Sequence, residues 1–595
     1  MKATRMLAFA MVCLWARSAE IFYGRVDLKG RGVFENLLAS SHDQNQPLPC
    51  NSSWAFAVAG ALSAQLNFLR KGAFPQTNLS VQFMLNCFPV EQSCSYELPG
   101  VEMEEVLNFL LREGLPSESC SHYASSDSKT CRPRNRCATC NKFIHSWDAQ
   151  VCTSAPYASF SIQKFEDLSW IRPQSFRQVH ERMLNALIKS GPIICQIEHG
   201  EKLFTFRTKD FIELYRSEEK GTYQTWVAVV GYQRDRWILQ HSFGQNVGYY
   251  GLISLDGSPE ENPLGLKNKC FSILANPEPK IVPNPEAYVS ADIFPPEFAK
   301  ILAKRDIDSE VRDSSPSETT KSAEENQKPE SQDIPPSKPT NFEPGKVSDD
   351  KDVDWRSDEG RNWLTQPKSE YLPGFCKSNW ALAAVTMLAD RLKIARSYLG
   401  ISYPELTFSS QALINCKEGG SCYGGDPTAV FERGFVWKLP IETCAQSTFR
   451  NPENYFCQTE SVCKVRSEMK IYPVESFAGV TIRSWGRLRG PVKIKEELRK
   501  GPVVCSMFVS KEFANYSRIS SKKLNIFSTQ RDFFRPNHFV EIIGFGSEGG
   551  VEYWIVRNFW GQEWGYDGVA YVALGINLLG IEADCSFAVP DFSEF

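Results

Sequence analysis

The feature that most constrains this chain is an internal repeat. The motif PCNSSWAFAV, beginning at Pro49, matches FCKSNWALAA, beginning at Phe375. Further on, GPIIC, ending at Cys195, matches GPVVC, ending at Cys505. The other matched pairs keep the same order along the chain: LSVQFMLNC with FSSQALINC, GLPSESC with KLPIETC, and WILQHSFG with WIVRNFWG. Landmarks that recur in one order indicate a duplication, so the chain is expected to fold as two copies of one domain.

A segment of different composition separates the two copies. Residues 304–352 are rich in Ser, Pro, Glu, Lys and Asp and almost free of aromatic residues. Such a segment buries too little apolar surface to offset the entropy lost on ordering, which predicts a flexible tether. A charged helix is the alternative, and the prolines argue against it. The predicted organisation is a signal peptide at 1–19, a first domain at 20–275, a linker at 276–350 and a second domain at 351–595.

The N-terminus has the pattern of a secretory signal peptide. Lys2 and Arg5 precede the apolar run MLAFAMVCLW, and small residues near Ala19 mark a cleavage site. A buried first helix is the alternative interpretation. No later run of about twenty apolar residues occurs, so no membrane span is expected. The pattern predicts entry into the secretory pathway, with an extracellular or lysosomal destination.

Net charge and cysteine content indicate which partners and which covalent links to expect. The formal net charge is -4, from 66 basic and 70 acidic residues, and no basic amphipathic run stands out, so no nucleic-acid partner is expected. Cys13 lies in the signal segment, which leaves 18 of the 19 cysteines. An even number in a secreted chain favours disulfides, although Cys137-Ala-Thr-Cys140 also has the spacing of a zinc site. No metal and no cofactor are expected.

Each copy begins with a helical pattern and continues with a strand pattern. Trp54, Val58, Leu62, Leu66 and Leu69 recur at spacings of three and four, which predicts one strongly apolar helix. Later segments such as YQTWVAVVGY and HFVEIIGFG are short, rich in β-branched and aromatic residues, and bounded by glycine. The fold class is therefore α+β, with a helix that faces a sheet across a cleft.

The motifs also resemble a known family, the papain-like cysteine proteases. The frame Cys-x-x-Cys-Trp-Ala at a helix start, followed by a distant His and by Asn-x-Trp-Gly, is similar to that family. A thiolate at a helix start is stabilised by the helix dipole, a nearby imidazolium pairs with it, and an amide orients the imidazole. The stretches KGAFPQTNLSVQ, RNRCATCNKF, VDWRSDEGRNW and EYWIVRNFWGQEWG resemble the cathepsin Z (cathepsin X) branch. The resemblance implies two tandem papain-like domains, each with a helical half that faces a β-barrel-like half, joined by a disordered linker.

In the first copy, the resemblance implies that all three catalytic residues are replaced. Ser53 takes the nucleophile position, Thr225 the base position, and His241 the position of the orienting amide. Gln44 lies where the family places its oxyanion-hole glutamine. Ser53 without a base is a poor nucleophile, and its alternative role is to cap the backbone N–H groups of the helix start.

The second copy keeps more of the family's site. His538, Asn558 and Trp560 occupy the positions of the base, its orienting amide and the shielding indole. The nucleophile position is Asn379, and an amide cannot replace a thiolate. The oxyanion position is Glu370, whose negative charge would repel a developing oxyanion. Neither copy is therefore expected to have peptidase activity.

Two further family features can be compared between the copies. The family's substrate-binding glycine pair is present as Gly424-Gly425 in the second copy, whereas the first copy has Tyr96-Glu97, whose side chains would crowd a peptide. A three-residue insertion that carries a histidine in cathepsin Z corresponds to Asn45-Gln46-Pro47 and Tyr371-Leu372-Pro373. The histidine is absent from both stretches.

The family's disulfide pattern would use all 18 cysteines. The implied pairs in the first copy are Cys50–Cys94, Cys87–Cys131, Cys120–Cys137, Cys140–Cys152 and Cys195–Cys270. Those in the second copy are Cys376–Cys422, Cys416–Cys457, Cys444–Cys463 and Cys505–Cys585. Sequons for N-glycosylation begin at Asn51, Asn78 and Asn515.

Three functions follow as hypotheses. The first is a secreted or endolysosomal pseudopeptidase that acts by binding a peptide, a cystatin-like inhibitor or a protein partner through the second copy. The second is a structural or storage glycoprotein without a ligand. The third is a cysteine-type carboxypeptidase of the papain family that takes part in proteolysis, which the missing sulfur argues against.

Overall fold

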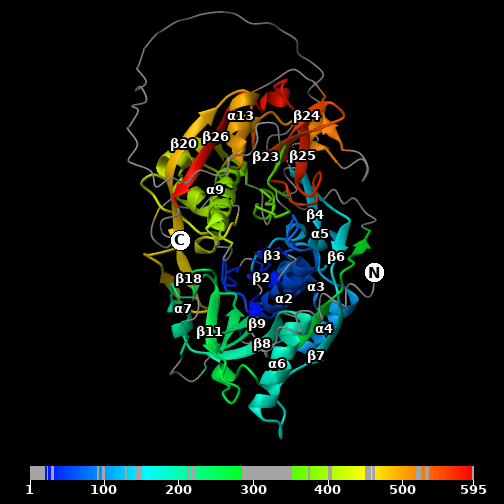
Figure 1. Ribbon diagram of the computed structural model, residues 1–595, viewed down its shortest axis with the longest axis vertical. Helices are drawn as coiled ribbons and strands as arrows, with labels where there is room; N and C mark the ends of the chain where they lie inside the picture. The colour runs from blue at the N-terminus through cyan, green and yellow to red at the C-terminus, as the bar shows by residue number, and fades with distance from the viewer. Residues whose placement is uncertain are drawn as a thin grey trace, which may run out of the picture. The chain divides into compact units, whose positions relative to one another are not determined.

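We describe the fold from a computed structural model of the 595-residue chain (Figure 1). The described residues are 21–22, 25–28, 32–35, 37–39, 41–89, 93–96, 101–127, 130–142, 150–210, 213–216, 221, 223–283, 352–358, 360–372, 376–399, 405–448, 457, 462–517, 524–529 and 535–591. Both copies belong to one compact unit.

The first copy begins with small strands and the central helix and continues into its sheet. Its helical elements are α2 (Ser53–Leu69), α3 (Val81–Cys87), α4 (Met103–Arg112), η1 (Glu118–Cys120), α5 (Pro133–Arg136), α6 (Phe176–Ser190), α7 (Lys202–Thr205) and η2 (Pro263–Gly265). Its strands are β1 (Ile21–Phe22), β2 (Arg25–Leu28), β3 (Gly32–Glu35), β4 (Ala138–Lys142), β5 (Gln150–Ser154), β6 (Tyr157–Ser159), β7 (Ile162–Asp167), β8 (Ile193–His199), β9 (Tyr223–Gln233), β10 (Arg236–Gln240), β11 (Leu252–Asp256), β12 (Cys270–Ala275) and β13 (Lys280–Val282).

The second copy repeats the central helix and the main sheet of the first, with different small elements between them. Its helical elements are α9 (Asn379–Tyr398), α10 (Ser410–Cys416), α11 (Pro427–Arg433), η4 (Glu442–Cys444), α13 (Pro491–Leu498), α14 (Lys511–Ala514) and η5 (Leu578–Gly580). Its strands are β14 (Val353–Asp354), β15 (Gly420–Ser421), β16 (Gly424–Gly425), β17 (Leu439–Pro440), β18 (Lys464–Arg466), β19 (Ile471–Pro473), β20 (Gly479–Leu488), β21 (Val503–Met507), β22 (Ile526–Phe527), β23 (His538–Glu548), β24 (Val551–Arg557), β25 (Val569–Ala573) and β26 (Cys585–Asp591).

The main sheets of the two copies have the same topology. The first runs β11-β10-β9-β8-β12-β7, and the second contains β25-β24-β23-β21-β26-β20 in the matching order. Strands β12 and β8 pair with Cys270 opposite Cys195, and β26 and β21 pair with Cys585 opposite Cys505. The duplication seen in the sequence is therefore a duplication of fold, and the α+β class is confirmed.

The central helix of each copy packs against its sheet. Helix α2 contacts β9, and α9 contacts β23 and β26 (Figure 1). Trp54, Val58, Leu62 and Leu66 are buried, as their spacing predicts. Leu69 is 43% exposed, because it lies in the last turn of α2, where the helix leaves the core.

A buried charge cluster distinguishes the core of the second copy. Arg557, at the end of β24, lies 2.7 Å from Asp390 of α9 and 2.8 Å from Glu541 of β23, and all three side chains are buried. In the first copy the equivalent positions are Gln240, Ala64 and Ala228, which carry no charge. The same positions between the central helix and the sheet are therefore filled by an ion cluster in the second copy and by uncharged side chains in the first.

Eight disulfides join the same cysteine pairs that the family resemblance implied, four in each copy. The ninth implied pair is Cys140–Cys152, whose side chains lie outside the described part of the chain. The backbone register of β4 and β5 places these two residues opposite each other. The zinc alternative is wrong for Cys137, since its sulfur is bonded to that of Cys120.

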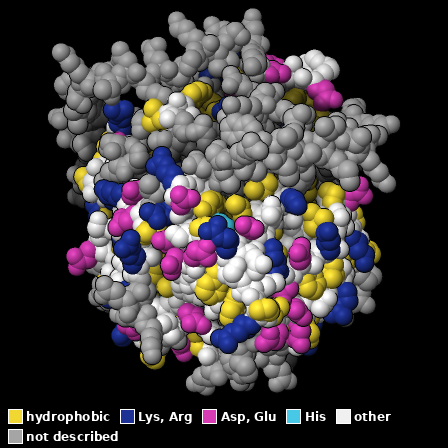
Figure 2. Space-filling view, turned by 60° about the horizontal axis from the view of Figure 1, so that its bottom comes forward, with side chains coloured by type: hydrophobic (Ala, Val, Ile, Leu, Met, Phe, Trp, Pro, Cys, Tyr) yellow, Lys and Arg dark blue, Asp and Glu magenta, His cyan; other side chains and the backbone are white. Residues whose placement is uncertain are grey.

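The domain limits can be compared with the sequence only in part. Strand β13 pairs with β6, so the structure of the first copy continues at least to Val282, beyond the boundary predicted at residue 275. The predicted signal peptide and most of the predicted linker lie outside the described residues. Within the described chain, no helix has both the length and the hydropathy needed to cross a membrane. Basic and acidic side chains are interspersed on the face in Figure 2, and no single sign dominates there.

Candidate functional site

The two residues that the sequence predicts at the base and orienting-amide positions lie together in the second copy. His538 begins β23, and Asn558 directly follows the neighbouring strand β24. The His538 Nε2 atom is 2.8 Å from Asn558 Oδ1, and the imidazole ring centre is 5.2 Å from that of Trp560. Because the adjacent antiparallel strands fix both residues, the resting geometry of a general base is in place without a thiol to serve.

The nucleophile position of this copy is held by three hydrogen bonds. Asn379 is the first residue of α9, and its Nδ2 atom donates to Glu370 Oε2 at 2.8 Å. Its backbone N–H donates to the same oxygen at 3.2 Å, and its Oδ1 atom accepts from Phe539 N at 3.1 Å. The Asn379 side chain therefore acts as a bridge between the helix start, the strand and the carboxylate.

Glu370 is the centre of this arrangement. Its Oε1 atom accepts from Trp560 Nε1 at 2.9 Å and lies 3.7 Å from His538 Nδ1. In a papain-like site, the backbone N–H at the nucleophile position faces the oxyanion of the reaction. Here that N–H donates to the side chain of Glu370.

The first copy has a different set of contacts at the equivalent positions. Ser53 Oγ accepts from Trp226 N at 3.2 Å. Trp226 is equivalent to Phe539, whose backbone N–H donates to Asn379 in the second copy. The predicted capping role of Ser53 is wrong, because the residue lies inside the first turn of α2 and its hydroxyl points to the strand. Thr225 Oγ1 lies 3.0 Å from Nε2 of His199, a histidine that the motifs did not single out.

The oxyanion glutamine of the first copy is also engaged. Gln44 Nε2 donates to the Tyr96 hydroxyl at 3.1 Å, and Gln44 Oε1 accepts from Ser242 Oγ at 2.6 Å. Tyr96 stands where the second copy has Gly424, and its hydroxyl donates to Asn45 Oδ1 at 2.5 Å. The side chain of Tyr96, which was predicted to crowd a peptide, thus contacts Gln44, the residue at the oxyanion position. Its neighbour Glu97 lies outside the described residues.

The two histidines near the first cleft are kept neutral by burial. Burial lowers the pKa of His241 to about 3 and that of His199 to about 4. His241 Nδ1 accepts from Phe243 N at 3.2 Å, so this ring is used within its own loop. A neutral imidazole that accepts a backbone hydrogen bond does not reproduce the orienting amide of the family.

The glycine pair of the second copy forms a two-residue strand. Gly424 and Gly425 make up β16, which pairs with β15, and no other described strand pairs with the second edge of β16. A Cβ atom on Gly425 would approach the ring of Trp380 to 2.5 Å, so this position requires glycine. Tyr423, beside the pair, is 83% exposed.

The predicted glycosylation sites differ in exposure. Asn515 is exposed, as a glycan requires. Asn51 donates from Nδ2 to Ser95 O at 3.2 Å, and Asn78 lines a cavity between the copies. Of these three asparagines, Asn515 is the most exposed, although its Nδ2 atom donates to Lys511 O at 3.0 Å.

The sequence motifs named these positions but did not indicate which side chains contact them. The contacts of Tyr96 with Gln44 and of Glu370 with Asn379 join residues that lie far apart in the chain or in different motifs. A sequence signal existed for the second contact, since a carboxylate replaces glutamine in the same copy in which asparagine replaces cysteine. The asparagine amide donates and the carboxylate accepts, so the two substitutions complement each other.

The comparison with protein families agrees with this geometry. The family described as papain family cysteine protease matches residues 35–272 and 350–589. The matched segments cover more than half of the chain, and the protein therefore belongs to the papain family of cysteine proteases, with the family's domain present twice.

Individual relatives match one copy at a time. Cathepsin Z of Onchocerca volvulus is 29% identical over 248 residues, which span 40% of this chain and 76% of that protein. Pro-cathepsin H of Mus musculus is 25% identical over 243 residues, which span 40% of this chain and 64% of that protein. A structure of bromelain from Ananas comosus in complex with E64 covers 40% of this chain and 97% of its own, at 22% identity and a TM-score of 0.32. The similarity to cathepsin Z agrees with the branch that the motifs indicated.

Proposed function

We propose that this protein is a catalytically inactive member of the papain family, secreted or endolysosomal, that acts by binding a peptide, an inhibitor or a protein partner. The observation that carries the proposal is the hydrogen bond from the Asn379 backbone N–H to Glu370. This contact places a carboxyl group where the family binds the oxyanion of the reaction. The backbone N–H that would stabilise a substrate's carbonyl oxygen during the reaction is therefore already hydrogen-bonded within the protein.

The chemistry of the nucleophile supports the same proposal. Ser53 and Asn379 take the place of the thiol, and each accepts a backbone hydrogen bond from the strand opposite. Loss of the nucleophile alone typically removes several orders of magnitude in rate. Ser53 lacks a histidine at the base position, where Thr225 contacts His199 instead.

The second copy offers a surface on which a chain could be held. The unpaired edge of β16 presents backbone groups without side chains, which suits an extended peptide that adds as a further strand. Tyr423 adds an exposed aromatic ring beside that edge. The eight disulfides suit an oxidising compartment, in which such a binding protein would meet extracellular or lysosomal peptides.

Titration calorimetry with the full chain tests the binding function. We expect saturable binding of peptides or of a cystatin-type inhibitor, with a dissociation constant on the order of micromolar. Gly424→Tyr, which copies the first copy's Tyr96, should abolish binding, because the ring would cover the edge of β16. The matched control is Tyr96→Phe in the first copy, which should leave the affinity unchanged.

Two results would count against this function. Absence of binding to a broad peptide mixture and to inhibitors would favour the structural glycoprotein instead. Equal loss of affinity in Gly424→Tyr and Tyr96→Phe would show that the edge of β16 is not the binding surface.

A further inference from the structure

The cleft of the first copy lies between two walls. One wall is the segment 45–47, which directly follows the oxyanion position at Gln44. The other wall is formed where β8 ends and β9 begins. Tyr223 lies two residues before Thr225, so both side chains leave β9 on the face that carries the base position. The ring of Phe204 packs on this wall, with its centre 5.7 Å from that of Tyr223.

A hairpin of the second copy contacts the first of these walls. Its strands are β18 and β19, which pair with Val465 opposite Tyr472. Asn45 Nδ2 donates to Arg466 O at 2.8 Å, and Arg466 Nη1 donates to Pro47 O at 3.0 Å. Strand β18 therefore lies along the segment 45–47, joined to it by hydrogen bonds in both directions.

The other strand of the hairpin contacts the second wall. The ring of Tyr472 stacks on that of Phe204, with centres 6.3 Å apart and planes 11° apart. Lys470 Nζ lies 2.9 Å from Glu201 Oε2, directly before the short helix α7 that carries Phe204. The hairpin thus has one strand against each wall of the cleft.

The turn of the hairpin lies near Tyr96, which crowds the same cleft. Burial raises the pKa of Tyr96, and the charge of Glu468 in the hairpin turn acts in the same direction, which places this carboxylate close to the phenol. Below the hairpin, Asn45 and Gln46 are only 1% and 2% exposed. Buried polar side chains need hydrogen-bond partners, and Gln46 Nε2 finds one in the backbone oxygen of Lys464, at 3.2 Å.

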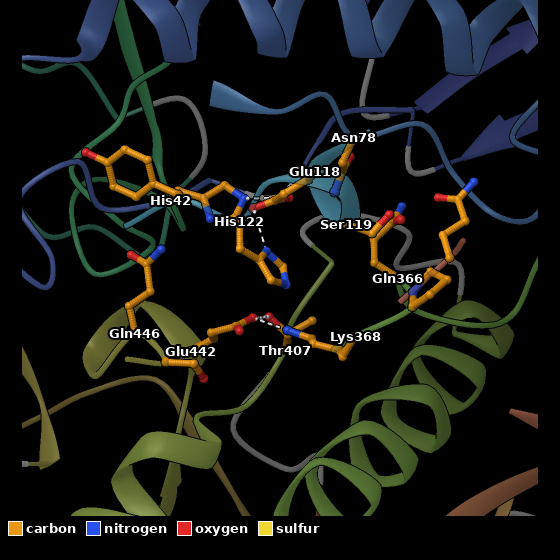
Figure 3. Close-up of a pocket in the computed structure, with 14 residues that line it drawn as sticks. His42, Asn78, Glu118, Ser119, His122, Gln366, Lys368, Thr407, Glu442 and Gln446 are labelled. Carbon is orange, nitrogen blue, oxygen red and sulfur yellow. Dashed lines mark hydrogen bonds and ion pairs between the residues drawn. The ribbon is translucent and has the colours of Figure 1, made fainter. Parts of the chain in front are cut away.

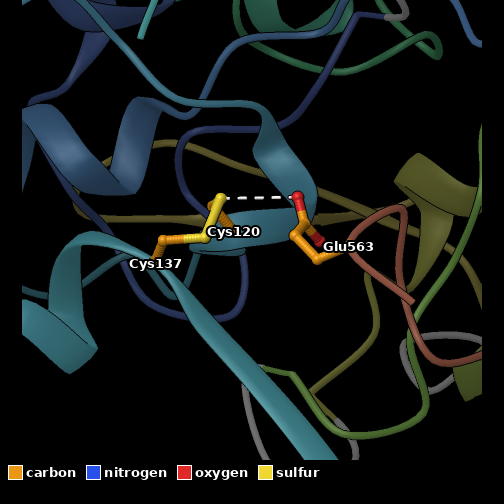
Figure 4. Close-up of side chains that lie close together, drawn as sticks. All are labelled: Cys120, Cys137 and Glu563. Atoms are coloured by element: carbon orange, nitrogen blue, oxygen red, sulfur yellow. Dashed lines mark hydrogen bonds between the residues drawn. A yellow bond between two sulfur atoms is a disulfide. The ribbon is translucent and has the colours of Figure 1, made fainter. Parts of the chain in front are cut away.

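Other contacts join the two copies beyond the hairpin itself. Asn246 Nδ2 lies 3.1 Å from Cys444 Sγ of the second copy, and Glu563 Oε1 of the second copy lies 3.4 Å from Cys120 Sγ of the first (Figure 4). Side chains of both copies also line a polar cavity of about 70 Å³, shown in Figure 3. The copies therefore remain in contact when the hairpin alone is altered.

We propose that the cleft of the first copy is an internal docking site, and that its ligand is the β18–β19 hairpin of the second copy. The hairpin fills the space between the walls in which the family binds a peptide chain. The first copy then serves to hold the second, and its own cleft is closed to peptides from outside the molecule. This inference does not depend on ligand binding by the second copy.

The labelling of one introduced thiol in the full chain tests the closure. Ser53→Cys places the thiol in the first cleft, and Tyr96→Gly, which copies Gly424, removes the first copy's own ring from that cleft. Reaction with a maleimide should stay slow, because the hairpin is still docked. Adding Arg466→Ala and Tyr472→Ala should speed labelling about tenfold, since one hydrogen bond from a charged group and one ring contact are lost.

Two further variants separate undocking from a defect in the hairpin. Asn45→Ala with Gln46→Ala removes the hydrogen bonds from the side of the first copy and should also speed labelling. Met469→Ala is the matched control, because this side chain lies in the hairpin turn and is 76% exposed. It should leave the labelling rate unchanged. Hydrogen exchange of the β8 and β9 amides should show that the first copy stays folded in every variant.

Two results would overturn the proposal. One is an equal labelling rate, slow or fast, with and without the substitutions at Arg466 and Tyr472, because the hairpin would then not close the cleft. The other is a Met469→Ala variant that reacts as fast as the variants that remove contacts with the walls.

Discussion

Replacing Asn379 by cysteine and Glu370 by glutamine together is expected to create thiol-dependent peptide cleavage in the second copy. His538 and Asn558 already stand 2.8 Å apart in the arrangement of a base and its orienting amide. The cysteine supplies the sulfur at the start of α9, and the glutamine turns a repelling carboxylate into a hydrogen-bond donor. With Asn379→Cys alone, the Glu370 carboxylate would still occupy the oxyanion position. Because one oxyanion donor is worth about 10²–10³ in rate, the double variant should exceed Asn379→Cys by at least that factor.

Fluorogenic peptide assays at mildly acidic pH measure this difference, with the alkylation of the new thiol as a second readout. The matched control is Ser53→Cys in the first copy, which should stay inactive because Thr225 and His241 replace its base and amide. If the single and double variants of the second copy have equal activity, Glu370 does not block the oxyanion position. If Ser53→Cys is active, the assignment of roles in the first copy is wrong.

Removing Arg557 is expected to destabilise the second copy by about 3–5 kcal/mol. Its guanidinium donates from Nε to Glu541 at 2.9 Å, from Nη2 to Asp390 at 2.7 Å and from Nη1 to Thr365 O at 2.9 Å. Burial raises the pKa of Asp390 and of Glu541, whereas the charge of Arg557 acts to lower both, so this cation favours the ionised form of each carboxyl group. Arg557→Ala leaves both carboxylates buried without it.

The first copy supplies the matched control for this cluster. There Gln240 Nε2 donates to Ala39 O at 2.7 Å, the contact equivalent to that of Arg557 with Thr365 O. The triple variant Asp390→Ala, Glu541→Ala and Arg557→Gln copies the neutral residues of the first copy and should recover most of the lost stability. Urea unfolding of the three proteins measures the differences. A triple variant as unstable as Arg557→Ala would contradict this view of the cluster.

The repeat of motifs in the sequence was sufficient to predict the α+β fold and its duplication. The segments YQTWVAVVGY and HFVEIIGFG predicted strands, and they form β9 and β23 at equivalent places in the two sheets. The roles of His538 and Asn558 followed from the family resemblance, because short motifs at strand ends place them. Strand β13 lies beyond the boundary predicted at residue 275. It carries no strong hydrophobic pattern and pairs with β6.

Contacts between distant motifs could not be predicted from either motif alone. Nothing local to Tyr96 indicates that its hydroxyl reaches Gln44, which lies 52 residues earlier. The interface between the copies was missed for the same reason. Asn45 and Gln46 were assigned to the family's three-residue insertion, without its histidine, and their burial against the second copy depends on tertiary packing. Polar residues at such positions look like exposed loop residues in a sequence.

The most direct test of the account is the turnover of model peptides by the unmodified, purified protein, with and without a thiol-alkylating reagent. The account predicts no cleavage above the uncatalysed rate in either condition, because no sulfur lies at the start of α2 or α9 and Glu370 fills the oxyanion position of the second copy. Cleavage that the alkylating reagent abolishes would contradict it.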